Sequence, residues 1–546
     1  MTEDPRTLVL GFDALDGRYL DRFADATPTL TGLRSEGVSA PLDSTDPPWT
    51  ASAWPSMYTG TDPSHHGVYS FFDYDYPDDG ELVSRTDVDA PALWNYLTER
   101  EIASVVLNVP VTHPAEPMDG ALVPGYLAGE DDDGYPSGIR DELSAAIGET
   151  YRLYSSGEMA DDPEAKLEGY LDLIDLRKRA AVELLSSREW ELAIVQVQKT
   201  DAVFHNFDDE AAFRAVYEAA DDLAAAVLDT VDGPVNVVVC SDHGMGRKEG
   251  YQIQLNDVLR NEGFLTATSA TKSVSLGSEK RKLMGEESES ATDDGASSLV
   301  TSGVATAEQV LSNVGVTPGR VYGLAESLGV EDLLLDVVPT SVRRSAGEGV
   351  DWRNSRAYCR SASRLGVRIN LAGREPSGTV PADEYHAVRE ELIDLLSDLE
   401  TPDGDPAFEE VVPREAVYDG PHVDDAPDVV VRPKDADHVL STSLYGREFV
   451  PADVHDHDPT GVFVAHGPSF EHDAAVDRLS LTDVAPIVMA ALGQPVPDRM
   501  TGTAPDGLLT GPVERTNYGE VPFGTTRVVA EAREEVTDSL ADLGYI

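Results

Sequence analysis

An aspartate and a histidine stand side by side at Asp242 and His243, directly after the apolar run formed by residues 235–240. The β-branched residues of that run predict a buried strand, and Gly244 ends it. An open α/β sheet places its ligand sites at the carboxyl ends of its strands. A carboxylate beside an imidazole suits zinc and neighbouring divalent metals. An Asp-His pair in a turn can equally serve capping and hydrogen bonding, so the interpretation depends on further ligands.

Two more apolar runs are followed by residues that could join such a site. Asp13 comes directly after residues 7–12, and Asp201 follows a run of the same kind. His205 comes four residues after Asp201, a spacing that places both side chains on one face of a helix or turn. A histidine-rich segment, residues 455–457, lies near the C-terminus. Together these side chains supply nearly enough oxygen and nitrogen ligands for two metal ions.

Thr50 is the candidate nucleophile. It follows Pro47, Pro48 and Trp49 and precedes the small residues 51–53, a composition that favours the start of a helix. The first turn of a helix offers unpaired backbone N–H groups and a positive dipole end to an anion. The alternative is that Thr50 is only a helix cap. The wider sequence context favours the first interpretation.

The order and spacing of these motifs resemble the alkaline phosphatase superfamily, in its type I phosphodiesterase/nucleotide pyrophosphatase branch. Thr50 lies ten residues before Gly60, a His-Gly pair follows at residues 66–67, and Ser-Asp-His-Gly-Met follows the later strand. The resemblance covers nearly the whole chain apart from a middle insertion, and it includes residues 107–112, 369–376 and 543–546. It implies an α/β fold, an alkaline-phosphatase-like three-layer sandwich with a mostly parallel central sheet and an inserted helical subdomain.

The resemblance also implies a site for two divalent metal ions, which we expect to be zinc, with manganese as the alternative. The first ion would be held by Asp13, Thr50, Asp242 and His243, and the second by Asp201, His205 and His457. Coordination would lower the pKa of the Thr50 hydroxyl, which would then attack phosphorus and form a covalent phosphothreonine. His457 is chosen because the family places its late histidine before a turn that ends in Gly and a strand that ends in Gly-Pro. His455 and His466 are the alternatives.

The function implied is that of a metal-dependent phosphohydrolase that cleaves phosphodiester or pyrophosphate bonds. A phosphomonoesterase or phosphomutase with the same site is one alternative, although the mutases of the superfamily usually use serine. A catalytically silent binding protein is another, but it would need a missing ligand, and none is missing. The motifs hold no evident arginine clamp for a phosphate dianion, which favours diesters, unless Arg374 or an arginine of the insertion reaches the site. Residues 69–72 replace an Asn of the characterised eukaryotic nucleotide pyrophosphatases, which puts that specific activity in doubt.

The composition is dominated by acidic residues. The 546 residues include 100 Asp and Glu against 41 Lys and Arg, a formal net charge of −59. This balance resembles the proteins of extremely halophilic archaea, because molar salt screens repulsion between surface carboxylates. Such a surface repels nucleic acids and anionic membranes, so we expect a small phosphate-containing substrate as the partner. The sequence leaves the oligomeric state open.

The N-terminal residues carry no basic flank or apolar targeting segment, and no run of about 18 apolar residues occurs, so we expect a cytoplasmic protein. Alternating strand and helix patterns predict a first part of the core over residues 1–262. Residues 263–349 are rich in Ser, Thr, Glu and Gly and predict a flexible, helical insertion that could act as a cap. The core is expected to resume over residues 350–546 and to supply the late histidine. Helices are predicted at residues 166–187, 209–229 and 382–399.

Overall fold

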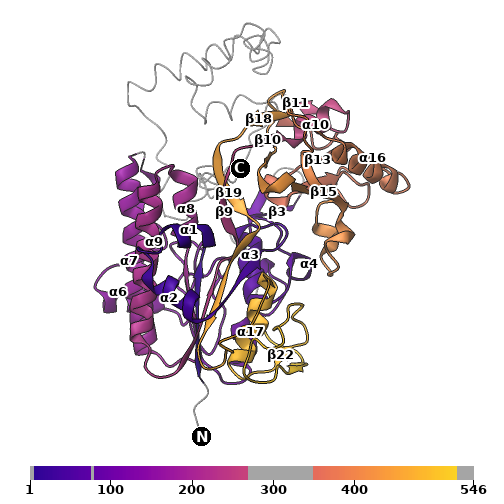
Figure 1. Ribbon diagram of the computed structural model, residues 1–546. Helices are drawn as coiled ribbons and strands as arrows, with labels where there is room; N and C mark the ends of the chain where they lie inside the picture. Colours follow the sequence, from indigo (N-terminus) through magenta and orange to yellow (C-terminus); the bar gives the residue numbers. More distant parts are fainter. Residues whose placement is uncertain (1–4, 76–78, 161, 269–348, 525–546) are drawn as a thin grey trace.

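The computed structural model describes residues 5–75, 79–160, 162–268 and 349–524. A sheet of eight strands forms the centre of the larger part of the molecule (Figure 1). Across the sheet the order is β21 (Leu479–Ser480), β2 (Val38–Asp43), β20 (Thr460–His466), β8 (Val235–Cys240), β1 (Arg6–Phe12), β7 (Leu192–Val197), β5 (Ser104–Leu107) and β6 (Gly120–Val123).

Five neighbouring strands of this sheet, from β8 to β6, run parallel. Leu10 of β1 faces Val195 of β7 on one side and Val239 of β8 on the other. These strands are apolar on both faces, as a sheet covered by helices on both sides requires. Strand β20 runs antiparallel to β8 and to β2. The predicted mixed α/β fold with a mostly parallel central sheet is confirmed.

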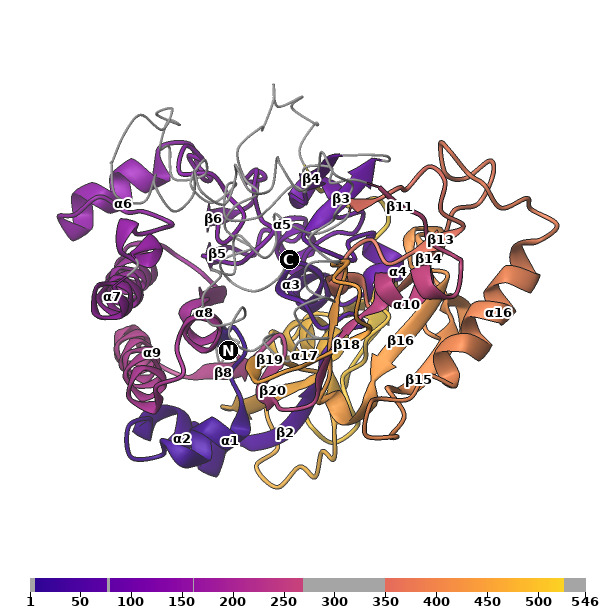
Figure 2. The same cartoon turned by 90° about the horizontal axis from the view of Figure 1, so that it is seen from above.

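Helices cover both faces of the central sheet. Helices α7 (Pro163–Ser187) and α9 (Glu210–Thr230) pack side by side on one face, and α3 (Thr50–Thr59) and α17 (Val484–Ala491) lie on the other (Figure 2). The first two correspond to the helices predicted at residues 166–187 and 209–229. The shorter helices of this part are α1 (Gly17–Arg22), α2 (Pro28–Glu36), α4 (Pro63–His66), α5 (Leu93–Thr98), α6 (Ile139–Ile147) and α8 (Lys199–Asn206).

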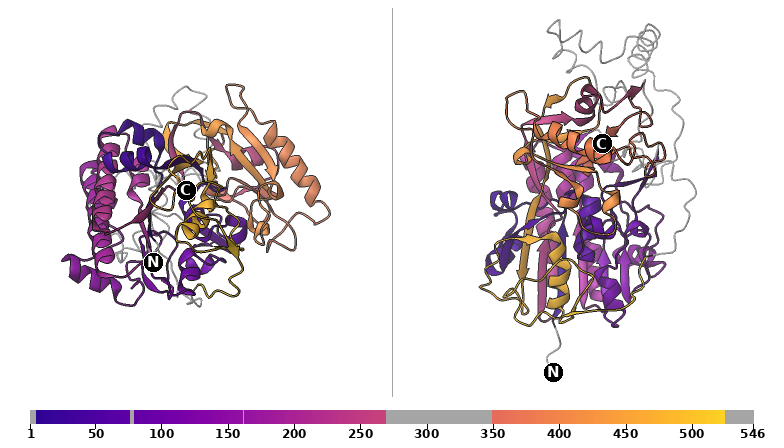
Figure 3. Two further views of the ribbon diagram at one scale, coloured as in Figure 1. Left: turned by 60° about the horizontal axis from the view of Figure 1, so that its bottom comes forward. Right: turned by 90° about the vertical axis from the view of Figure 1, so that its right-hand side faces the viewer.

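A smaller unit lies beyond the carboxyl ends of the parallel strands (Figure 3). Its four-stranded antiparallel sheet has the order β13 (Ala357–Tyr358), β14 (Gly366–Ile369), β16 (Val429–Pro433) and β15 (Phe408–Pro413). Helix α16 (Tyr385–Ser397), at the third predicted helix, and α10 (Leu255–Asn261) pack on it around a separate apolar cluster. We expected the core to resume from residue 350. These four strands pair with one another instead, and the central sheet takes up later parts of the segment through β20 and β21. The predicted helical insertion falls almost wholly on residues 269–348, outside the described residues.

Short strand pairs connect the two parts. They are β9 (Gly244–Lys248) with β19 (Val454–Asp458), and β10 (Tyr251–Gln254) with β17 (Val439–Ser441) and β18 (Phe449–Pro451). The remaining pairs are β3 (Phe72–Asp75) with β4 (Asp79–Leu82), β11 (Ala267–Thr268) with β12 (Gly349–Val350), and β22 (Val496–Pro497) with β23 (Arg515–Thr516). In the described part of the chain, no helix has the length and apolar character needed to cross a membrane.

Candidate metal centre

Three adjacent strands of the central sheet deliver the predicted acidic residues to one edge. Asp13 directly follows β1, Asp242 follows β8, and Asp201 lies in the first turn of α8, which follows β7. Because β7, β1 and β8 are neighbours and run parallel, their carboxyl ends meet at one place. All three carboxylates are buried.

The late histidine reaches this edge through a two-stranded ladder. Strand β19 pairs antiparallel with β9, in a register that sets His457 opposite Met245. The ring of His457 consequently stacks on that of His243, with centroids 3.7 Å apart and planes inclined by 17°. The neighbouring His455 packs instead against the rings of Phe204 and Phe213.

A first donor set gathers around Asp13. Its Oδ1 lies 3.3 Å from Thr50 Oγ1 and 3.5 Å from His243 Nε2. His243 Nε2 is also 3.3 Å from Asp242 Oδ2. Both of these last atoms are buried, and neither has a hydrogen-bond partner within the described residues. Buried polar atoms are costly unless they are paired or bind a metal, so this set fits a cation.

A second donor set gathers around Asp201. Its Oδ1 lies 3.1 Å from His205 Nε2 and 3.5 Å from His457 Nε2. The two imidazole Nε2 atoms are 3.3 Å apart. Potential ligand atoms of Asp201, His243 and His457 all lie within 4.8 Å of one another, as do those of Asp13, Asp242 and His243. His243 thus stands between the two sets.

Backbone carbonyls orient two of the imidazoles. Nδ1 of His243 is 3.0 Å from the Gly244 carbonyl oxygen, and Nδ1 of His457 is 2.9 Å from that of Pro48. A carbonyl only accepts, so the Nδ1 atoms carry the protons and donate them, and each Nε2 keeps its lone pair. Metal-binding histidines are oriented by partners of this kind.

The pKa values of the buried aspartates and histidines depend on burial and on the close approach of their charges. Burial, with repulsion from Asp242 and Asp201, raises the pKa of Asp13 well above its ordinary value. Burial also raises the pKa of Asp242, to about 7. For Asp201 burial acts in the same direction, but His205 and His457 outweigh it and hold the pKa well below its usual range. Burial lowers the pKa of His243 and His457 and so favours the neutral rings that bind metals. Three carboxylates this close would all ionise most readily around cations.

Thr50 is the first residue of α3, as the sequence predicts, and it is buried. The preceding Trp49 makes no side-chain cap. The N–H groups of Ser52 and Ala53 bond to the Trp49 carbonyl. Within this helix the N–H groups of Thr50 and Ala51 are the ones whose position leaves them without an intrahelical acceptor. The helix therefore presents a hydroxyl and two donors at the same end.

Sequence reasoning missed the residues that hold Asp13. Trp54 Nε1 and Gln196 Nε2 each donate to Asp13 Oδ2 over 3.1 Å, and Thr200 Oγ1 donates to its carbonyl oxygen over 2.6 Å. Gln196 carried a signal, since it is a polar residue within the apolar strand β7. Trp54 lies one turn after Thr50 on α3, where an aromatic residue reads as core.

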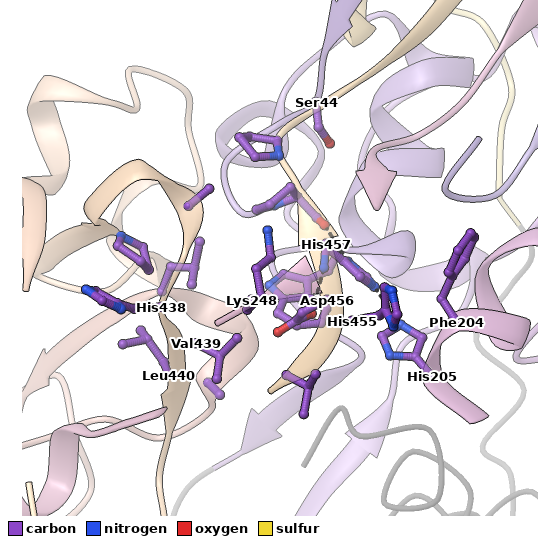
Figure 4. Close-up of a pocket in the computed structure, with 18 of the residues that line it drawn as sticks. Ser44, Phe204, His205, Lys248, His438, Val439, Leu440, His455, Asp456 and His457 are labelled. Carbon is purple, nitrogen blue, oxygen red and sulfur yellow. Dashed lines mark hydrogen bonds between the residues drawn. The ribbon is translucent and has the colours of Figure 1, made fainter. Parts of the chain in front are cut away.

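A cavity of about 670 Å³ opens beside the second donor set. Figure 4 shows His205 and His457 toward one end of it, His438, Val439 and Leu440 toward the other, and Lys248 between them. The walls therefore come from both parts of the molecule. Thr50 lies next to Trp49, which lines the cavity.

Comparison with known proteins identifies the family. The profile of the type I phosphodiesterase/nucleotide pyrophosphatase family matches residues 7–322. The chain belongs to this family. Family members are hydrolytic enzymes that generally depend on two metal ions, and the buried Asp and His clusters described above could bind metal. No curated protein sequence matches the chain.

Solved structures of the same fold include phosphonoacetate hydrolase from Sinorhizobium meliloti in complex with phosphonoformate. It is 15% identical, with a TM-score of 0.55 over 90% of this chain and 96% of that one. The same enzyme with phosphonoacetate gives 16% identity and a TM-score of 0.54 over the same shares. Murine ectonucleotide pyrophosphatase/phosphodiesterase 5 is 13% identical, with a TM-score of 0.48 over 92% of this chain and 100% of that one.

Two stretches singled out in the sequence of this phosphodiesterase family member make structural contacts: one joins its two parts, and the other lies within the smaller unit. Tyr69 and Ser70 belong to the stretch that replaces an Asn of the eukaryotic enzymes. The Tyr69 hydroxyl donates to the His422 carbonyl over 3.0 Å, and the Ser70 hydroxyl lies 2.8 Å from that of Ser363. Arg374 makes a two-pronged contact of 2.7 Å and 2.7 Å with the carboxylate of Asp428 inside the smaller unit. Its guanidinium is therefore engaged there.

Proposed function

We propose that the protein is a metal-dependent phosphohydrolase that cleaves phosphodiester or pyrophosphate bonds through a covalent phosphothreonine. The observation that carries this proposal is the pair of donor sets around Asp13 and Asp201, with the hydroxyl of Thr50 3.3 Å from Asp13 Oδ1. The unpartnered Asp242 Oδ2 and His243 Nε2 support a cation there.

The residues divide into two ligand groups. Asp13, Thr50, Asp242 and His243 would hold one divalent ion, and Asp201, His205 and His457 the other. Nitrogen and carboxylate ligands favour zinc, with manganese as the alternative. When bound, the ions would supply the positive charge that acidifies the Thr50 hydroxyl and stabilises the oxygen of the leaving group.

Thr50 performs the chemical step in this proposal. Its oxygen attacks phosphorus and forms a new O–P bond while the bond to the leaving oxygen breaks, and the proton lost by Thr50 ends on the leaving oxygen. Water then attacks the phosphothreonine, the Thr50 O–P bond breaks, and Thr50 regains a proton. The N–H groups of Thr50 and Ala51, at the start of α3, would donate to the non-bridging oxygens as they gain charge. Asp13 fixes the hydroxyl before the attack.

The cavity supports a substrate with a sizeable leaving group. Its volume of about 670 Å³ falls within the range of small-molecule sites. Both cationic side chains in its wall, other than histidines, are engaged in ion pairs: Lys248 with Asp458, and Arg432 with Asp46. In the described wall of this cavity, Arg432 is thus not offered as a two-pronged clamp for a phosphate dianion. This arrangement favours a monoanionic diester over a monoester.

The test is a comparison of kcat/KM for bis-p-nitrophenyl phosphate and p-nitrophenyl phosphate, with zinc- and manganese-loaded protein in molar salt. We expect the diester to be preferred. A monoester preference of about tenfold, equal to about 1.4 kcal/mol in the transition state, would favour the phosphomonoesterase or phosphomutase alternative. Loss of both activities in fully loaded protein would favour a silent binding protein.

A further inference from the structure

A chain of buried hydrogen bonds runs from helix α7 to Asp13. Arg177 Nε donates to Asn108 Oδ1 over 2.9 Å. Asn108 Nδ2 donates to Gln196 Oε1 over 2.9 Å, and Gln196 Nε2 donates to Asp13 Oδ2 over 3.1 Å. Gln196, Arg177 and Asn108 are only 0%, 4% and 5% exposed. These hydrogen bonds therefore have little access to water.

Arginine sets the direction of every bond in this chain. A guanidinium only donates, so Asn108 must turn its carbonyl oxygen toward Arg177 and its NH₂ toward Gln196. Gln196 must then accept with its own carbonyl oxygen and point its NH₂ at Asp13. A Gln196 amide without these partners could flip and turn its oxygen toward Asp13. Here the flip is excluded, because Arg177 and Asn108 both donate in the direction of Gln196.

Arg177 itself is held in place. Its two Nη atoms donate to the backbone carbonyls of Arg152 and Leu153 over 2.7 Å and 2.8 Å. Its guanidinium also lies 4.8 Å from the ring centroid of Tyr151. Asn108 occupies a left-handed backbone conformation, with φ +64°, directly after strand β5, and donates a second time to the Gln196 carbonyl over 3.0 Å. Arg177 and Asn108, where this series of hydrogen bonds begins, are thus as fixed as Asp13, where it ends.

At the far end, the chain selects which oxygen of Asp13 remains available. Oδ2 accepts from both Gln196 and Trp54. Oδ1 is the atom that faces Thr50 and His243. The donors therefore leave one defined oxygen for the candidate metal centre.

We propose that Arg177, Asn108 and Gln196 are positioning residues that orient the Asp13 carboxylate for the first metal ion. This proposal rests on the proposed function, and it assigns a role to the stretch around Asn108 that the motifs alone do not explain. Outer partners of metal ligands typically contribute 10- to 100-fold to metal affinity.

The decisive variant is Asn108→Asp, which keeps the shape of the side chain. The new carboxylate still accepts from Arg177, but it offers Gln196 an acceptor where the amide offered a donor. If Gln196 flips to bond to the new carboxylate, its carbonyl oxygen turns toward Asp13; if it does not flip, it loses the bond that fixes its orientation. In either case the donor to Asp13 Oδ2 is removed or no longer fixed. The second variant is Arg177→Gln, which removes the guanidinium that sets the direction of these hydrogen bonds and adds no negative charge. It serves if Asn108→Asp folds poorly.

The matched control is Asn236→Asp, the same change at another buried asparagine of the central sheet. Asn236 lies near the start of β8, away from the carboxyl ends of the strands, and donates to Ser469 Oγ and the Ala491 carbonyl. Its substitution costs stability but leaves Asp13 untouched.

The experiment titrates metal-free protein with cobalt alone, without substrate, and follows visible absorption and the number of ions bound. We expect Asn108→Asp and Arg177→Gln to bind one of two ions 10- to 100-fold more weakly, with the other within about twofold. Asn236→Asp should bind both as the wild type does. Equal cobalt affinities in Asn108→Asp and wild type, or equal losses in the two Asn→Asp variants, would overturn the positioning role alone. A wild-type protein that binds no cobalt and cleaves no phosphate ester would overturn the proposed function with it.

Discussion

Thr50 differs from the other aliphatic hydroxyl residues of helix α3 in what its oxygen contacts. Ser52, Ser56 and Thr59 each donate to a backbone carbonyl three or four residues earlier, as hydroxyls in helices commonly do. Thr50 Oγ1 instead reaches the carboxylate of Asp13. Three hydroxyls of the helix therefore bond to its own backbone, and the fourth, that of Thr50, faces the candidate metal centre.

We predict that Thr50→Ala abolishes turnover of a phosphodiester while the protein stays folded. The change removes the proposed nucleophile and one metal ligand together, so the loss should span several orders of magnitude. Ser52→Ala, two residues further along the same helix, is the control and should keep most of the activity. Circular dichroism checks the fold of both. Activity above about 1% of wild type in Thr50→Ala would contradict the assignment.

The three late histidines have different surroundings, which leads to a second prediction. His457 lies 3.5 Å from Asp201 Oδ1, His455 packs against two phenylalanine rings, and the ring of His466 lies near that of His472. His457→Ala should lose one of two bound metals, whereas His455→Ala should keep both. Metal content after dialysis measures this directly. An intact pair of ions in His457→Ala would transfer the role to another histidine.

At the scale of elements, the site depends on how closely helix α3 approaches strand β1. A Cβ atom added to Gly11 would lie 2.5 Å from Cη2 and 2.8 Å from Cζ3 of Trp54. The indole is fully buried and donates to Asp13, so it has little room to move. A side chain at residue 11 would have to displace the donor that fixes the Asp13 carboxylate.

We therefore predict that Gly11→Ala lowers the free energy of unfolding by about 1–3 kcal/mol through overpacking, and that it also weakens metal binding. Gly32→Ala in helix α2 is the matched control, because a Cβ there meets nothing within 4 Å and alanine favours a helix. Denaturant unfolding of the metal-free proteins gives the first effect, and cobalt titration gives the second. Identical stability and affinity in Gly11→Ala and wild type would show that α3 can move without cost.

The sequence predicts those elements whose pattern is local. The apolar runs before Asp13 and Asp242 read as strands because both faces of a parallel sheet are buried. Helix α7 is long and periodic, and the spacing of Asp201 and His205 matches α8. Parallel strands bring their carboxyl ends together, so the first donors could be placed at one edge.

What sequence patterns missed depends on contacts between distant segments. The pairing of β19 with β9 joins segments about 200 residues apart and sets His457 beside His243, and only the resemblance to a family indicated that histidine. The donors to Asp13 come from α3 and β7, where Trp54 and Gln196 look like packing residues. The strands of the smaller unit pair with one another across long connections, and a local pattern does not show that they form a sheet apart from the central one.

At the scale of the whole molecule, the charge balance cannot be neutralised by ion pairs. With 100 acidic and 41 basic residues, 59 carboxylates have no basic residue left to pair with one to one. Basic side chains on the surface are already engaged, as in the pairs Arg34–Asp21 at 2.7 Å and Arg214–Asp25 at 2.6 Å. The surplus must be screened by solvent ions.

The last prediction is that folding requires salt. In 1 M salt the Debye length is ~3 Å and neighbouring carboxylates scarcely interact, whereas at 0.1 M it grows to ~10 Å and the surplus charge repels itself. Thermal unfolding in KCl should therefore show a midpoint that rises steeply between 0.1 M and molar concentrations. NaCl at matched ionic strength should act alike if screening is the cause, and a neutral osmolyte at matched osmolality separates this effect from general exclusion of cosolutes. A protein equally stable at both ionic strengths would contradict the prediction, because 59 unpaired charges would then have to be accommodated without screening.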